Sequence, residues 1–175
     1  RLGKQLVDKY LVDMESISED TVPVLGANVT NLRNFDQVTD ALDQFTEVVN
    51  SNPAAYVSLL GQARANTYAY SFFLPEDQYG PPTTIDIGDF MRRVSSAAND
   101  DDLKDAADEV SIALDNVRIY GSAGSQLSRY TSYYNIYFPQ RSTDFDTGYL
   151  QQTPLQDWAL MLRAFYGGAS PQSRA

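Results

Sequence analysis

Two aspartates near the middle of the chain have a type and spacing that could recognise a basic group. Asp86 and Asp89 lie three residues apart in Ile85-Asp86-Ile87-Gly88-Asp89-Phe90, where an apolar extended segment leads into a helical pattern. Paired carboxylates at such a junction could form an acidic subsite for a basic substrate. The interpretation that we favour is structural, because either aspartate can cap the following helix and interact favourably with its dipole.

A second acidic segment has the alternating oxygen ligands of a calcium loop. Asp144-Phe145-Asp146-Thr147-Gly148 places carboxylates at its first and third positions. A calcium hand also needs further carboxylates and a glutamate at its twelfth position, and counting from Asp144 that position is Leu155. We therefore expect no cofactor, and calcium binding at this segment remains an alternative.

Three other polar motifs have structural interpretations. Asp100-Asp101-Asp102 precedes a predicted helix and is interpreted as a helix cap with solvated charge. Gly121-Ser122-Ala123-Gly124-Ser125 lacks the Lys-Ser/Thr ending of a phosphate loop and the central serine of a nucleophile elbow, so it is expected to be a loop. Asn28-Val29-Thr30 is a glycosylation triplet, which matters only in a eukaryotic secretory context.

The chain of 175 residues contains no cysteine and no histidine. A chain without these residues has no thiolate nucleophile, no disulfide, and no imidazole base or metal ligand. We therefore assign no catalytic, cofactor-binding or metal-binding residue, and we expect the chain by itself to be inactive in thiol- or imidazole-based catalysis. Whether it forms part of an enzyme is left open by these residues alone.

The composition is that of a globular protein with an acidic surface. Apolar residues make up 43% of the chain and charged residues 21%, and the formal net charge is −10 at pH 7. Since the 13 lysines and arginines are scattered, the chain should repel the phosphates of nucleic acids, and we expect no nucleic-acid partner. No apolar run approaches the roughly 20 residues of a membrane span.

Apolar residues recur at helical spacing through most of the chain and define the elements that must position these side chains. The spacing predicts helices over residues 2–14, 30–50, 53–67, 90–98, 103–117 and 154–166. No linker divides the chain, so residues 1–168 are expected to form one unit and residues 169–175 a disordered tail. The first helix is already under way at Arg1, which favours a piece of a longer precursor.

Two segments later in the chain change from helical to strand-like spacing. Residues 117–121 and 133–138 are rich in β-branched and aromatic residues and flank a Gly- and Ser-containing connection, which favours an antiparallel pair. Alternation places Tyr134, Ile136 and Phe138 on one face. One face should belong to the core, and the aromatic cluster of Tyr130, Tyr133, Tyr134, Tyr137 and Phe138 could line a groove. The predicted fold class is α/β in the full protein, with this segment mainly helical and containing a few strands.

The order of these fragments is similar to the C-terminal half of the clostripain-like cysteine peptidases. The Ile85–Phe90 segment, a helical pair, the strand near Val117 and Tyr134-Asn135-Ile136-Tyr137-Phe138-Pro139 follow one another as they do in that family. A closing helix with Trp158 and an opening helix with Leu6-Val7-Asp8-Lys9-Tyr10 extend the resemblance over roughly residues 5–166.

This resemblance implies a caspase-like fold in the full protein, with the catalytic His and Cys upstream of this chain. It also implies cleavage after basic residues, Arg or Lys, in protein or peptide substrates, and a secreted or cell-surface location. The chain would complete the fold around the upstream catalytic portion, which is its expected partner, without contributing a catalytic residue. Two alternatives remain open: a stand-alone acidic helical binding or scaffold module, and an inactive homologue that has lost the upstream dyad.

Overall fold

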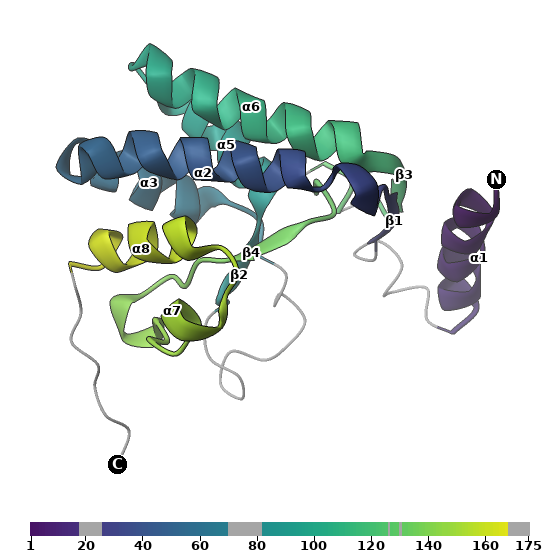
Figure 1. The fold of residues 1–175 in the computed structure, drawn as a ribbon. Coiled ribbons are helices and arrows are strands. Elements are labelled where there is room, and N and C mark those ends of the chain that lie inside the picture. Colours follow the sequence, from purple (N-terminus) through teal and green to yellow (C-terminus); the bar gives the residue numbers. More distant parts are fainter. Residues whose placement is uncertain (18–25, 70–81, 126, 130, 168–175) are drawn as a thin grey trace.

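The computed structural model describes residues 1–17, 26–69, 82–125, 127–129 and 131–167 (Figure 1). Over these residues the chain is mostly helical and forms two short antiparallel pairs of strands. The predicted mainly helical segment with a few strands is therefore confirmed. The predicted tail at 169–175 lies outside the described residues.

Helices make up most of the described chain. They are α1 (Leu2–Ile17), α2 (Asp36–Ser51), α3 (Pro53–Asn66), α5 (Ile87–Ala97), α6 (Asp101–Val117), α7 (Tyr149–Gln152) and α8 (Gln156–Phe165), with 3₁₀ turns at Leu32–Asn34 and Ser142–Asp144. Pro53 begins α3 at the position where its missing N–H costs no hydrogen bond. The last helix begins later than predicted, because the N–H of Thr153 still closes α7 on Tyr149 O at 3.1 Å.

The strands pair with partners that are distant in sequence. β1 (Gly26–Thr30) lies antiparallel to β3 (Arg118–Ala123), and β2 (Thr84–Asp86) lies antiparallel to β4 (Asn135–Tyr137). Each pair is short, so much of its stability has to come from the helices packed around it.

The two strand-like segments near the end of the chain do form antiparallel strands, but the prediction that they pair with each other is wrong. Each lies in a different two-stranded sheet. Between them, Ser128 N donates to Gly124 O at 2.9 Å and Thr131 N donates to Leu127 O at 3.1 Å. These helical turns carry the chain from one sheet to the other. A tight hairpin would instead have placed the two segments side by side in one sheet.

An aromatic cluster joins α2, α5, α8 and the end of β4 in the core. Phe45, Phe90, Phe138 and Trp158 are at most 1% exposed. Phe90 meets Phe138 and Trp158 edge to face, with ring centroids 5.4 and 6.2 Å apart, a favoured aromatic geometry. The Trp158 indole donates to Tyr137 O at 2.9 Å, which ties α8 to β4.

Above this cluster, α6 packs against both α2 and α5 (Figure 1). β4 turns Ile136 toward this core, and Phe138 follows it on the same side; both are buried, whereas Asn135 is exposed. The predicted alternation is therefore confirmed, and its core face is the one that carries the aliphatic and phenyl side chains.

A buried arginine and a tyrosine satisfy backbone carbonyls beside the short β2–β4 sheet. Arg64 of α3 is 5% exposed, and it donates from Nε to Phe138 O at 2.5 Å and from Nη2 to Pro82 O at 2.8 Å. The Tyr166 hydroxyl donates to Pro139 O. Burial lowers the pKa of Arg64 and raises that of Tyr166. These donors replace the hydrogen bonds that a longer sheet would have supplied.

The first helix stands beside the rest of the protein and contacts β1 and β3 (Figure 1). Val7 is its buried residue, at 5% exposure. Lys4 Nζ donates to Asp8 Oδ2 at 2.7 Å and to the Tyr120 hydroxyl at 2.9 Å, and that hydroxyl donates to Asp8 Oδ1 at 2.6 Å. This polar triad, the burial of Val7 and the close approach of Gly3 to Val29 dock α1 on the β1–β3 sheet.

The docking of α1 should depend on the ionised state of Asp8. Hydrogen bonds from Lys4 and Tyr120 hold the pKa of Asp8 below its ordinary value. The carboxylate therefore stabilises the fold above the pKa of the unfolded chain, and this stabilisation is lost as the pH falls through the lowered pKa of the folded chain. Tyr120→Phe should raise the pKa of Asp8 toward its ordinary value.

An NMR titration of the Asp8 carboxyl carbon measures this shift, and the same change at the exposed Tyr10, Tyr10→Phe, is the matched control. Amide exchange in α1 should also become faster in Tyr120→Phe. An unchanged Asp8 pKa in that variant would contradict the triad.

Candidate functional site

The junction between β2 and α5 buries both aspartates that the sequence singles out. Asp86 has no exposed surface and Asp89 is 5% exposed. Asp86 has an extended backbone, and its Oδ1 accepts the N–H of Asp89 at 2.8 Å. The capping interpretation is therefore confirmed for Asp86, and Asp89 lies in the first turn of the helix that it caps.

The second oxygen of Asp86 holds a distant segment of the chain. Its Oδ2 accepts from Ser132 N at 2.6 Å and from the Thr131 hydroxyl at 3.0 Å. The Ser132 hydroxyl in turn accepts from Gly88 N at 3.1 Å. A Cβ at Gly88 would lie 2.4 Å from Ser132 Cβ, so only glycine allows this approach. Asp86 thus joins α5 to the segment that leads into β4.

Asp89 faces a different set of partners. Its Oδ2 accepts from Tyr68 N at 2.9 Å and from Arg93 Nε at 3.1 Å, and its Oδ1 lies 3.5 Å from Arg92 Nη2. Asp86 and Asp89 therefore do not act as a pair, because each carboxylate is directed to its own donors. The geometry gives no support to an acidic subsite at this junction.

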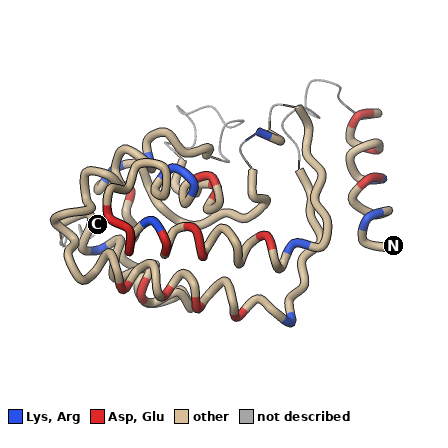
Figure 2. Tube along the Cα trace, turned by 90° about the horizontal axis from the view of Figure 1, so that it is seen from above, with Lys and Arg blue, Asp and Glu red and all other residues tan. Residues whose placement is uncertain are grey.

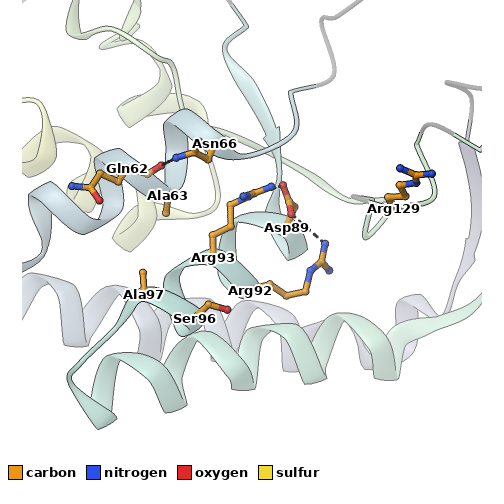
Figure 3. Close-up of a pocket in the computed structure, with 9 residues that line it drawn as sticks. All are labelled: Gln62, Ala63, Asn66, Asp89, Arg92, Arg93, Ser96, Ala97 and Arg129. Carbon is orange, nitrogen blue, oxygen red and sulfur yellow. Dashed lines mark hydrogen bonds and ion pairs between the residues drawn. The ribbon is translucent and has the colours of Figure 1, made fainter.

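The space beside Asp89 is a cationic groove of about 510 Å³ (Figure 3). Arg92 and Arg93 both point toward Asp89, and Arg129 comes from a separate segment. The groove was not predicted from the sequence, because the basic residues are scattered along the chain. The signal that could have found it is the Arg92-Arg93 tandem one helical turn after Asp89, since residues three and four apart share a helix face.

The segment predicted as an alternative calcium site uses its oxygens internally. Arg141 donates to both oxygens of Asp144, at 2.8 and 3.0 Å, and this pairing lowers the pKa of Asp144. Asp146 Oδ1 accepts from Gly148 N at 2.8 Å. Within the described residues, no group of three or more acidic side chains could hold a metal ion. Calcium binding here stays an untested alternative.

The other three polar motifs of the sequence lie at a helix start, in β3 and in β1. Asp100 caps α6 by accepting Leu103 N at 3.0 Å, as predicted. The expected loop at 121–125 is partly wrong, because residues 121–123 belong to β3. Asn28 of the glycosylation triplet lies in β1, and its Nδ2 is buried with no hydrogen-bond partner in the described part of the chain. Glycosylation of Asn28 in the folded chain would require that strand to move.

Tyr133 is held in a backbone conformation that L-residues rarely adopt. Its φ of 71° is the one positive value among the non-glycine residues that the structure describes. The N–H of Tyr133 donates to the Thr131 hydroxyl at 2.8 Å, and its ring lies over Gly121 with Arg118 5.6 Å from the ring centroid. Such a conformation costs on the order of 1–3 kcal/mol and persists because its surroundings fix it.

Part of the predicted aromatic cluster lines a groove and part does not. Tyr133 and Tyr134 line a mainly apolar groove of about 270 Å³, together with Phe35 and Leu155. Tyr137 instead accepts Asp146 N at 2.7 Å and donates to the carbonyl of Asp144 at 3.1 Å, so it fixes the 142–148 turn. Tyr130 lies outside the described residues.

No family model, curated protein or solved structure matches this chain. The resemblance to the clostripain-like peptidases therefore depends on the order of its motifs. Among the helices of the described residues, none has the length and hydropathy needed to cross a bilayer.

Asp86→Ala should destabilise the fold by about 3 kcal/mol or more, because it removes a cap and leaves the buried N–H of Ser132 without an acceptor. Asp100→Ala removes the cap of α6 at an exposed position, and it should cost only about 1 kcal/mol. Chemical denaturation of both variants measures the difference. Equal losses would mean that the buried contacts of Asp86 add nothing to its role as a cap.

Gly121→Ala should destabilise the fold by about 1–3 kcal/mol, since a Cβ would lie 2.6 Å from Tyr133 Cε2. In a Tyr133→Ala background the same change should cost almost nothing, because the ring is gone. A double-mutant cycle measured by denaturation tests the contact. If Gly121→Ala lowers the free energy of unfolding equally in both backgrounds, the loss does not come from contact with the Tyr133 ring.

Proposed function

We propose that this chain is the non-catalytic C-terminal portion of a clostripain-like cysteine endopeptidase that cleaves after Arg or Lys. In this proposal the catalytic thiol and imidazole lie upstream, and the chain supports the portion that carries them. The order of its motifs and the absence of cysteine and histidine favour this role. The observation that carries it is an apolar corner of the protein that nothing in the described chain covers.

This corner consists of α1 and the strand beneath it. Nine large hydrophobic side chains are exposed among the described residues, and four of them lie on α1: Leu2, Leu6, Tyr10 and Val12. A fifth, Ile119, lies on β3 beside Tyr120, the residue that bonds to α1, and strand alternation directs it to the other face of the sheet. Leu2, Leu6 and Tyr10 follow one another at four-residue spacing, so they form one stripe along the helix. Leu2 and Leu6 are 70% and 61% exposed. A stripe of this kind marks a surface that another body covers.

The β1–β3 sheet at the same corner also favours an external partner. Each strand has one partner strand within the described residues, so each keeps one edge without a neighbour. Two-stranded sheets are marginal in water and become stable when further strands or helices join them. A catalytic portion that packs on α1 would cover the apolar stripe, and a strand of that portion could pair with a free edge of this sheet.

The contribution of the chain to catalysis would be positional. A thiolate and an imidazole must lie within hydrogen-bond reach of each other, so their supporting elements have to be rigid. The aromatic core and the Asp86 network give α5, β4 and α8 fixed positions. The net charge of −10 also favours the approach of substrates with basic residues.

The test compares the chain alone with the complete gene product on an arginyl peptide substrate. The chain alone should be inactive, and the complete protein should cleave the substrate and be inhibited by a thiol reagent. Leu6→Asp in the chain, added in trans to the upstream portion, should weaken its association about ten- to a hundredfold, since it replaces with a charge a leucine that the complex would bury. Ile112→Asp is the matched control, because Ile112 is an exposed side chain of the same size on α6, away from the stripe. This change should leave the association unchanged.

Two outcomes would contradict the proposal. A complete gene product without an upstream thiol and imidazole would favour the binding module or the inactive homologue. If the complete protein is an active protease but neither Leu6→Asp nor Ile112→Asp weakens the association of the two portions, the α1 stripe is not the surface on which they meet.

A further inference from the structure

The groove beside Asp89 has the opposite charge to most of the protein. Acidic residues dominate the two long helices above the core: α6 carries six of them and one lysine, and α2 carries four and no basic residue (Figure 2). The groove is lined by three arginines and one carboxylate, which gives it a formal charge of +2. On a chain with a net charge of −10, such a groove favours a short anionic group over a long polyanion.

Asp89 fixes the direction of the arginine that faces this groove. Asp89 is itself held by the backbone N–H of Tyr68, and it binds Arg93 through Nε. Both Nη nitrogens of Arg93 are then left without an acceptor among the described residues, and the side chain is 34% exposed. A guanidinium that is already oriented loses less conformational entropy when it binds a ligand. Its outer edge offers two parallel N–H donors, the arrangement that a carboxylate accepts.

The other residues of the groove suit a peptide. The Gln62 amide, the Oδ1 of Asn66 and the Ser96 hydroxyl can pair with backbone N–H and C=O groups, whereas the Nδ2 of Asn66 already donates to Gln62 O at 2.8 Å. Ala63 and Ala97 leave room for a backbone to approach. No aromatic ring is found among the described residues that line the groove, so a nucleobase would have no stacking partner. The volume of about 510 Å³ can hold several residues of an extended segment.

We propose that this groove binds an acidic peptide segment, with one aspartate or glutamate side chain seated on the Nη edge of Arg93. Arg129 lies at the opposite end of the groove from Gln62, and it contacts a second acidic residue of the segment (Figure 3). The inference stands on the groove alone and does not require the peptidase role proposed above.

The test uses a blocked, fluorescently labelled hexapeptide with two glutamates, and its glutamine counterpart, titrated with the whole chain at low ionic strength. The glutamate peptide should bind saturably and the glutamine peptide about tenfold more weakly or not at all. Arg93→Gln and Arg129→Gln should each weaken binding of the glutamate peptide about tenfold. Arg33→Gln removes the same charge at an exposed position outside the groove and should leave binding unchanged.

Arg129→Gln keeps the test valid if Arg93→Gln disturbs the fold, because Arg129 is exposed and makes no side-chain hydrogen bond to the described residues. Equal binding of the two peptides, or equal weakening by Arg33→Gln, would overturn the proposal. Saturable binding of inorganic phosphate that depends on Arg93 and Arg129, without binding of the glutamate peptide, would also overturn it and would identify a phosphate site.

Discussion

The carboxylate of Asp86 must find its hydrogen-bond donors inside the protein, because the residue has no exposed surface. It finds them in two segments that are far apart in the sequence: Asp89 N at the start of α5, and Thr131 and Ser132 about 45 residues further along the chain. A buried carboxylate with fewer donors would cost several kcal/mol, on the order expected for an unpaired buried charge. This requirement fixes where α5 starts, and it also fixes the approach of the chain to β4. The strained Tyr133 lies directly after the two residues that Asp86 holds.

The need of buried polar groups for hydrogen-bond partners also explains the side-chain contacts around the short strands. The β2–β4 pair has three residues in each strand, so the ladder leaves carbonyls around it without backbone donors. Side chains from helices fill these places: Trp158 on Tyr137 O, Arg64 on Phe138 O and Tyr166 on Pro139 O. The rings of Trp158 and Tyr166 also pack against Phe138, so hydrogen bonding and apolar burial act at one point. The end of β4 is therefore the place where α3 and α8 are both attached to the sheet.

The surface divides into regions with different chemistry. The helices α2 and α6 are acidic, the groove beside Asp89 is cationic, and α1 exposes an apolar stripe next to the uncovered edge of a two-stranded sheet. The first region favours solubility and attraction of basic groups, whereas the other two are surfaces that favour particular partners. Under our proposal the apolar corner meets the catalytic portion of the same protein. The groove is a separate place for an acidic segment, so one chain would have two independent docking surfaces.

The sequence by itself determined the local structure. Helical periodicity predicted six of the helices, five of them to within three residues at each end, whereas α2 begins six residues later than predicted because Thr30 belongs to β1. Pro53 marked the start of α3, and the alternation from Tyr134 to Phe138 separated the two faces of β4 without showing which one is the core. These features depend on contacts between near neighbours, which residue types and spacing encode. The absence of cysteine and histidine likewise excluded whole classes of chemistry without any structure.

Only the tertiary structure decided which strands pair and where charges meet. The segments at 117–121 and 133–138 look like a hairpin, yet each pairs with a strand from earlier in the chain, because the turns between them redirect the backbone. Arg92 and Arg93 become a cationic groove only when Asp89 is buried beside them and Arg129 arrives from another segment. Strand pairing and charge clustering depend on residues far apart in the sequence, and their proximity exists only after the chain has folded.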